Sequence, residues 1–111
     1  MNDRFKTIIN SKRPVLVDFY ADWCDPCKAM VPIVNQLKKE IRELRVVKVN
    51  VDHNPIIAHT FGVKSLPTVI VFMDGKPCWT GTGFQSDKQL RDALNSVASD
   101  HSDHCQLPLS S

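Results

Sequence analysis

Two cysteines separated by two residues stand out as the chemically reactive feature of this sequence. Cys24 and Cys27 directly follow an apolar run and lie where a helical pattern begins. A thiol is a good nucleophile only as the thiolate, and a helix N-terminus stabilises a thiolate through its unpaired N–H groups and partial positive charge. The pair therefore predicts reversible dithiol–disulfide exchange, although the spacing alone also fits half of a zinc site.

Length and composition indicate one ordinary globular domain. A chain of 111 residues can bury a single modest core, and 42% hydrophobic with 23% charged residues argues against wholesale disorder. The net charge is only +2 and the basic residues form no stripe among aromatics, so no nucleic-acid partner is expected. The longest apolar run, residues 69–73, is far shorter than the roughly 20 residues of a membrane span, so no membrane partner is expected.

The N-terminus and the cysteine count bear on the compartment. Residues 1–6 carry charges where a secretory signal needs an unbroken apolar stretch, so we expect a cytosolic protein. In a reducing cytosol a C-x-x-C pair is more often catalytic or metal-binding than structural. A zinc site would need two further ligands, and the remaining candidates are isolated: Cys78, His101, His104 and Cys105. No metal is therefore expected, and Cys78 is interpreted as an inert thiol, buried or half-buried.

Three predicted elements surround the cysteine pair. Apolar residues at helical spacing in 5–9 predict a short helix, which Pro14 ends. Residues 15–20 are nearly all apolar, the pattern of a strand covered on both faces. A long amphipathic helix is then predicted from about residue 24 to about residue 44, with an apolar stripe formed by Met30, Ile33, Val34, Leu37 and Ile41.

The second half predicts alternating strands and helices. Residues 45–51 predict a strand, and residues 54–62 predict a short helix with proline at its first position and glycine at its end. Residues 68–73 predict a third strand, which a tight turn at Asp74-Gly75 ends.

The last two predicted elements are an edge strand and a helix. Residues 77–82 predict a strand that begins with Pro77, and a central strand would not accept that proline. Ser86 and Gln89 form a capping box for a final helix, whose buried stripe is Leu90, Ala93, Leu94 and Val97. The order α-β-α-β-α-β-β-α predicts an α/β fold, with a central mixed sheet and helices on both faces.

The motif and the order of elements together resemble the thioredoxin family over residues 1–98. The matching segments are residues 15–19 (VLVDF), 21–24 (ADWC), 26–28 (PCK), Pro32, 48–52 (KVNVD), 66–68 (LPT), 74–75 (DG) and Gly83. The resemblance implies a thioredoxin fold, with a mixed sheet of four strands, or five, flanked by about four helices. Residues 99–111 are polar and aperiodic, and we interpret them as a flexible C-terminal tail.

The resemblance also implies an activity. The chain would be a protein-disulfide oxidoreductase that reduces disulfides in target proteins. Cys24, nearer the helix end and more exposed, would be the nucleophile, and Cys27, more shielded, would resolve the mixed disulfide. Such a protein needs no bound cofactor. Its partners would be an electron donor of the thioredoxin reductase type and protein substrates with disulfides, and it is expected to be a monomer.

A carboxylate inside an apolar strand is the next candidate. Burial of Asp18 would raise its pKa and allow the carboxylate to accept a proton near neutral pH. In the family the matching aspartate lies beneath the second cysteine and is paired with a lysine, whose position here is Lys48. The residues alone also allow a simpler alternative, in which an aspartate at a strand end bonds nearby backbone amides.

Residues around the cysteines are expected to contact substrate. In the family the proline matching Pro67 is cis and faces the cysteine pair, and the backbone before it, here Leu66, pairs with substrate as a β-strand would. From the residues alone, Pro67 would be an ordinary strand-start proline and Trp23 would be a packing residue. The substrate-binding residues that the resemblance implies are Trp23, Asp25, Pro26, Leu66, Pro67 and Gly83.

The chain departs from the family pattern at two places. Asp25 stands where the family usually has glycine, and its charge would oppose thiolate formation, so we expect a modestly raised pKa at Cys24 and a reducing poise. Only four residues precede Phe5, so the first family strand is expected to be missing and residues 45–51 to form an open sheet edge.

Two other functions remain compatible with the sequence. One is an exported or isomerase-like thiol oxidoreductase, and the other is a non-catalytic thioredoxin-fold binding module. No histidine stands between the cysteines, which argues against strong oxidants and isomerases. The presence of both cysteines argues against the binding module.

Overall fold

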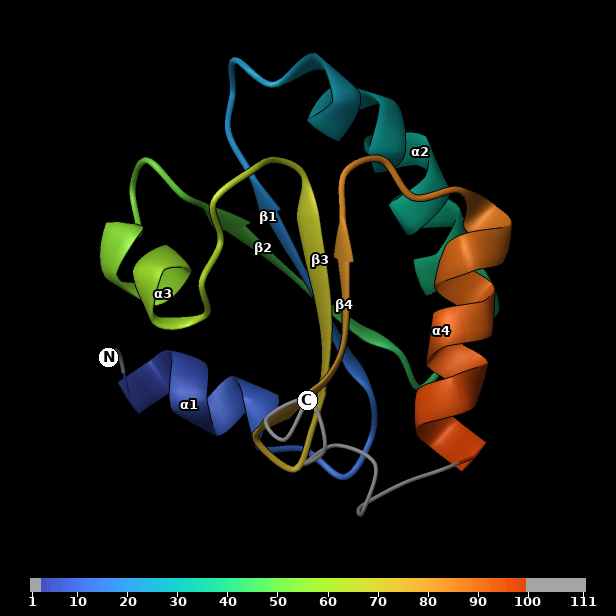
Figure 1. Ribbon diagram of the computed structural model, residues 1–111. Helices are drawn as coiled ribbons and strands as arrows, with labels where there is room; N and C mark the ends of the chain where they lie inside the picture. The colour runs from blue at the N-terminus through green and yellow to red at the C-terminus, as the bar shows by residue number, and fades with distance from the viewer. Residues whose placement is uncertain (1–2, 100–111) are drawn as a thin grey trace.

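The computed structural model describes residues 3–99, in which a four-stranded sheet lies between two layers of helices (Figure 1). The elements in chain order are α1 (Asp3–Ile9), β1 (Val15–Tyr20), α2 (Asp25–Glu40), β2 (Arg45–Asn50), α3 (Pro55–Thr60), β3 (Thr68–Met73), β4 (Lys76–Thr82) and α4 (Asp87–Ser99). The predicted α/β class, with four strands and four helices in this part of the chain, is confirmed. None of these helices is long and apolar enough to cross a membrane.

The strand β1 lies in the interior of the sheet. The strands are ordered β2-β1-β3-β4, with β1 parallel to β2 and antiparallel to β3. Covered on both sides by neighbouring strands and on both faces by helices, residues 15–19 are all buried, which explains their nearly continuous apolar sequence. The register sets Asp18 opposite Lys48 on β2 and Val69 on β3.

Each face of the sheet carries its own core. On the face covered by α1 and α3, the rings of Phe61 and Phe72 meet edge to face with centroids 5.0 Å apart. On the face covered by α2 and α4, fully buried Leu16, Met30 and Leu90 belong to one cluster. The apolar stripes predicted for the two long helices are the faces that these helices turn toward the sheet.

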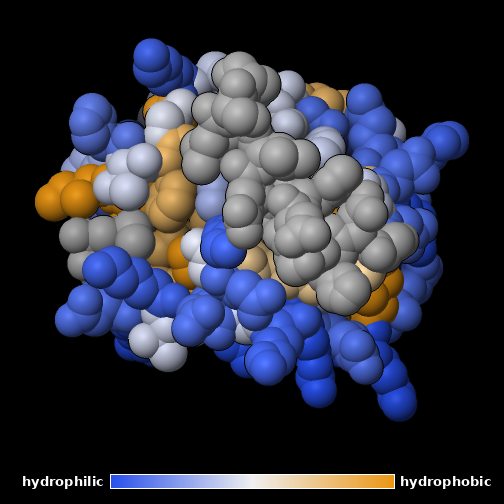
Figure 2. All heavy atoms as spheres, turned by 60° about the horizontal axis from the view of Figure 1, so that its bottom comes forward, coloured by the Kyte–Doolittle hydropathy of each residue, from blue (hydrophilic) through white to orange (hydrophobic). Residues whose placement is uncertain are grey.

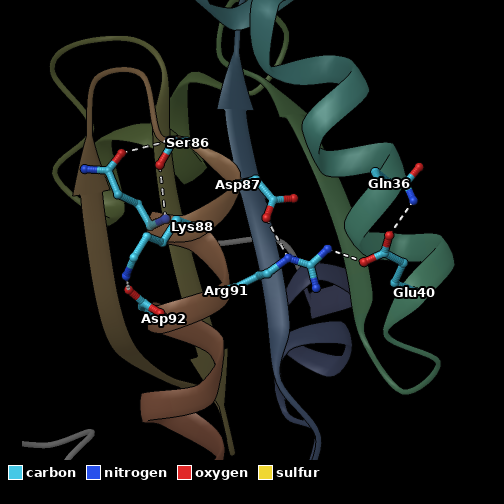
Figure 3. Close-up of polar contacts among 8 residues, drawn as sticks. Gln36, Glu40, Ser86, Asp87, Lys88, Arg91 and Asp92 are labelled. Carbon is cyan, nitrogen blue, oxygen red and sulfur yellow. Dashed lines mark hydrogen bonds and ion pairs between the residues drawn. The ribbon is translucent and has the colours of Figure 1, made fainter.

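The helix α4 begins as its sequence indicates and is anchored to α2 by an arginine. The Ser86 N–H donates to Gln89 Oε1 at 2.8 Å, and the Gln89 N–H donates to Ser86 Oγ at 3.1 Å, so the predicted capping box is present (Figure 3). Farther along the helix, Arg91 donates to Asp87 on its own helix and to Glu40 at the end of α2. Glu40 also accepts a hydrogen bond from Gln36, so its carboxylate is fully engaged.

The end of α2 differs from the prediction. The helix stops at Glu40 rather than near residue 44, and Ile41 has an extended conformation with φ −105° and ψ 98°. The reason is tertiary: Leu44 is buried in the core, and Arg45 must pair with Val15 for β2 to lie parallel to β1. The strand ends shift by only one residue, since β2 ends at Asn50 and β4 begins at Lys76.

Within residues 3–99, β2 has β1 as its only strand neighbour, which agrees with the expected open edge. At the opposite side, β4 is the other edge strand, as Pro77 predicts. The predicted C-terminal tail, residues 99–111, lies outside the described residues except for Ser99, which ends α4.

Candidate functional site

The cysteine pair is joined by a disulfide at the start of α2. Cys24 is the N-cap residue, with φ −93° and ψ 107°, and Pro26 lies in the first turn, where its missing N–H leaves no helical bond unmade. The Cys27 N–H donates to Cys24 Sγ at 3.2 Å, and the Cα atoms of the two residues are 5.3 Å apart. When the disulfide is reduced, the same N–H and the helix dipole are placed to stabilise a thiolate on Cys24.

The two cysteines are equally buried, so the expectation of a more exposed Cys24 is wrong for this oxidised form. Each residue is only 4% exposed. Both pack with Ala21, and the partly buried side chains of Tyr20, Val51 and Leu66 cover this small cluster. The difference between the cysteines therefore lies in what each one faces rather than in how much solvent reaches it.

A cavity of about 180 Å³ lies on the Cys27 side of the pair. Cys24 does not contribute to its wall, which is formed by Asp18, Tyr20, Ala21, Asp22, Cys27, Lys28, Val31 and Lys48. The space is large enough for water and is lined by several polar groups that could bind it. The cavity therefore connects Cys27, and not Cys24, with the buried carboxyl group of Asp18.

Asp18 is buried in the middle of β1. It is 2% exposed, and its Oδ1 atom has no hydrogen-bond partner within residues 3–99. Desolvation raises the pKa of Asp18 above its ordinary value, and the positive charge of Lys48 lowers it to a smaller extent. The simpler alternative, an aspartate at a strand end bonded to backbone amides, does not describe this geometry.

Lys48 stands beside Asp18 but does not form a direct ion pair with it in the described part of the chain. Its Nζ atom lies 5.6 Å from the centroid of the Tyr20 ring, and the residue is exposed. The arrangement is a cation–π contact at the cavity wall. Lys48 therefore acts on Asp18 through its electric field rather than by a hydrogen bond.

Trp23 projects into solvent beside the cysteines. It is 68% exposed, so ordinary packing does not account for it. Its indole Nε1–H donates to Asp52 Oδ2 at 3.0 Å, and the Asp52 N–H in turn donates to Asn50 Oδ1 at 2.9 Å. Asp52 was not among the predicted site residues, although it lies in the KVNVD segment that carries the resemblance.

The loop before β3 brings Leu66 and Pro67 to the site. The Leu66–Pro67 peptide bond is cis, as the resemblance implies, and Leu66 packs against the cysteine cluster. The Pro67 carbonyl accepts the Gly83 N–H at 2.8 Å, and Gly83 adopts φ +88°, a conformation that favours glycine. Phe84 follows with 48% exposure, and nothing in its sequence context marks this aromatic as a surface residue.

Asp25 and Pro26 are exposed on the first turn of α2. The Asp25 carboxylate lies 3.7 Å from Lys28 Nζ, and its side chain is 93% exposed. Solvent and Lys28 both screen this charge from Cys24.

Among residues 3–99, no group of three or more His, Cys, Asp or Glu side chains is arranged to hold a metal ion. Cys78 is half-buried in β4, as expected, but it is disulfide-bonded rather than an inert free thiol. That part of the expectation is therefore wrong.

Comparison with known proteins gives consistent matches to one family. The family model described as thioredoxin matches residues 1–96. A thioredoxin of Rickettsia felis is 41% identical over 91 residues, covering 81% of this chain and 87% of that protein. The Fasciola hepatica thioredoxin structure superposes with a TM-score of 0.78 at 35% identity, covering 84% of this chain and 90% of that one. Oxidised mitochondrial thioredoxin 3 of Saccharomyces cerevisiae gives a TM-score of 0.79 at 31% identity, covering 85% and 88%.

The raised pKa of Asp18 predicts a pH-dependent gain of stability for Asp18→Asn. As the pH rises above the ordinary aspartate pKa of 3.8, Asp18 loses its proton in the unfolded chain before it does so in the folded protein. The free energy of unfolding therefore falls until the pH passes the pKa of Asp18 in the folded protein. Asparagine does not ionise, so the stability of Asp18→Asn does not fall in this way. The variant should be more stable than the parent at neutral pH, by about 1.4 kcal/mol for each pH unit separating the folded from the unfolded pKa.

Urea unfolding of the oxidised proteins between pH 3 and pH 8 measures this difference, which should vanish below about pH 4. Asp22→Asn is the matched control, because Asp22 lines the same cavity but is exposed, and its effect should stay within about 0.5 kcal/mol. Equal stabilities of parent and Asp18→Asn at every pH would contradict the burial argument.

Proposed function

The chain belongs to the thioredoxin family and is a protein-disulfide oxidoreductase, and we propose which residue acts in each step of the reaction. We propose that the reduced protein transfers two electrons to a disulfide of a target protein and ends in the oxidised form, with Cys24 bonded to Cys27. The observation that carries the proposal is the asymmetric position of the two sulfurs. Cys24 Sγ accepts an N–H at the helix start, whereas Cys27 faces the cavity that holds Asp18.

In the first step, the Cys24 thiolate attacks one sulfur of the substrate disulfide. The substrate S–S bond breaks, a mixed disulfide forms between Cys24 and the substrate, and the other substrate sulfur leaves as a thiolate that takes up a proton. Support for Cys24 as the nucleophile comes from its N-cap position, where the Cys27 N–H and the helix dipole favour negative charge on its sulfur.

In the second step, Cys27 gives its proton to the Asp18 carboxylate and attacks Cys24 Sγ. The mixed disulfide breaks, the Cys24–Cys27 disulfide forms, and the second substrate sulfur leaves as a thiolate. The cavity supports proton transfer through water between Cys27 and Asp18, and the raised pKa makes Asp18 a better proton acceptor than an ordinary aspartate. Lys48 would assist by stabilising the carboxylate before the transfer.

Substrate would bind over the surface around the cysteines. The exposed Trp23 ring, held by Asp52, offers apolar area on one side, and the Leu66–Pro67 segment offers backbone groups for strand-like pairing on another. Asp25, Pro26 and Gly83 would complete the contact region. This surface suits an extended polypeptide carrying a disulfide better than a small molecule.

The proposed direction of electron flow requires a supply of electrons and a reducing compartment. We therefore include a donor of the thioredoxin reductase type as the partner that regenerates the dithiol, protein disulfides as substrates, and the cytosol as the place of action. A monomer is sufficient for this chemistry, because one chain provides both sulfurs and the carboxyl group.

A trapping experiment tests the proposed roles of Cys24 as the nucleophile and Cys27 as the resolving thiol. Reduced Cys27→Ser, mixed with insulin as the disulfide substrate, should accumulate a covalent adduct on Cys24 that dithiothreitol releases, because the resolving thiol is missing. Catalytic insulin reduction by Cys24→Ser should fall by a factor on the order of 10³ or more, since the nucleophile is lost.

The doubly substituted Cys24→Ser/Cys27→Ser protein is the control for adducts on any other cysteine. The proposed roles would be reversed if Cys24→Ser formed an adduct on its Cys27 while Cys27→Ser formed none on its Cys24. Insulin reduction by Cys24→Ser at the parent rate would contradict the mechanism and favour a binding role for the domain.

The charge of Asp25 predicts a small effect on Cys24 reactivity. In Asp25→Gly the fraction of Cys24 present as thiolate at neutral pH should rise, because a nearby negative charge is removed. Exposure of the side chain and its contact with Lys28 limit the increase to about two- to threefold. The pH dependence of iodoacetamide alkylation of the reduced protein measures this fraction.

Asp25→Asn is the matched variant, because it removes the charge without the backbone freedom of glycine. It should show the same increase. An unchanged or smaller thiolate fraction in both variants would overturn the electrostatic argument.

A further inference from the structure

A second cavity lies at the end of the molecule opposite the cysteine pair. It has a volume of about 510 Å³ and is lined by Ser11, Arg13, Lys38, Arg42, Glu43, Leu44, Arg45 and Val46. The loops that form it lie at the lower end in Figure 1, whereas α2 begins with the cysteines at the upper end. Figure 2 turns this lower end toward the viewer, and hydrophilic residues dominate the part of it that grey atoms do not cover.

The sheet itself brings the basic residues of this cavity together. The parallel pairing of β1 and β2 sets Val15 beside Arg45, and the Arg45 N–H donates to the Pro14 carbonyl at 3.4 Å. Arg13 lies just before β1 and Arg45 lies at the start of β2, so both residues are at the same end of the sheet. Lys38 lies in the last turn of α2 and Arg42 lies in the loop after that helix, and both also line the cavity.

The positive charge of the cavity is not neutralised locally. None of the four basic side chains forms an ion pair with a carboxylate in the described part of the chain. Glu43 is the single acidic residue in the lining, and Glu40 nearby is already engaged by Arg91 and Gln36. The lining thus holds four basic residues against one acidic residue, whereas the whole chain has 14 basic against 12 acidic residues.

Stabilisation of the helix terminus explains only part of this cluster. Basic residues in the last turn complement the negative end of a helix dipole, and Lys38 and Arg42 are placed for that role. Arg13 and Arg45 belong to a different loop and to a strand, so the helix does not account for them. Three arginines from separate segments line the same cavity. Arginine suits oxyanion recognition, because each guanidinium group can donate hydrogen bonds to two oxygens at once.

We propose that this cavity binds a compact, multiply charged phosphate anion, of which pyrophosphate is the simplest member. The volume lies within the range of ligand sites, roughly 300–1,000 Å³. The lining holds no aromatic ring on which a nucleobase could stack, so recognition is confined to the phosphate groups. Because the site lies at the far end of α2 from the cysteines, the anion binds without covering the redox centre.

Calorimetric titration of the oxidised full-length protein with pyrophosphate, at about 0.15 M ionic strength, tests the proposal. Saturable binding of one anion per chain is expected. Arg45→Gln should weaken it about tenfold and Lys38→Gln at least about threefold, because each loses a charge-assisted hydrogen bond. Glu43→Gln should tighten binding, since the only negative charge in the lining is removed.

Lys64→Gln is the matched control for Lys38→Gln, because Lys64 is exposed and lies outside the cavity. It should leave the affinity unchanged, and circular dichroism should show every variant folded. The proposed site would be contradicted if pyrophosphate showed no saturable binding, or if Lys38→Gln and Lys64→Gln weakened its binding equally. Tighter binding of hexaglutamate than of pyrophosphate would also overturn it, by showing a surface for acidic polypeptide.

Discussion

The burial of one carboxyl group is the constraint around which this site is arranged. Asp18 lies in the middle of β1, covered by strands on both sides and helices on both faces, with Oδ1 left without a hydrogen bond in the described structure. Apolar residues would make a more stable strand at this position, because a buried carboxylate carries a large desolvation cost. The acid lies where a cavity connects it to Cys27, and in the proposed mechanism it accepts the proton of that cysteine.

The same constraint explains how two equally buried cysteines can act differently. Cys24 receives an N–H at the helix start, so its environment favours a thiolate. Cys27 faces the cavity and Asp18, which we propose as the acceptor of its proton when the mixed disulfide is resolved. In the proposed mechanism, the helix terminus activates Cys24 for the first exchange step and the buried acid activates Cys27 for the second.

Much of this arrangement could be predicted from the sequence, because the signals are local. Helical periodicity and the Ser86–Gln89 pair located α4, and the continuous apolar run identified β1 as interior. The end of α2 could not be predicted in this way, since it depends on pairing between Arg45 and Val15, which are distant in sequence. The equal burial of the cysteines likewise depends on Val51 and Leu66, which approach from two separate loops. The basic cavity required the parallel pairing of β1 and β2 to bring Arg13 next to Arg45.

The proposed mechanism depends most on the transfer of the Cys27 proton to Asp18 during resolution of the mixed disulfide. The most direct test is the single-turnover rate of that step, measured from pH 5 to pH 9 by stopped flow for the parent and Asp18→Asn. We expect a slower rate for the variant at neutral pH and a smaller difference at high pH, where Cys27 loses its proton without assistance. Equal rates for the two proteins at pH 7 would contradict this mechanism.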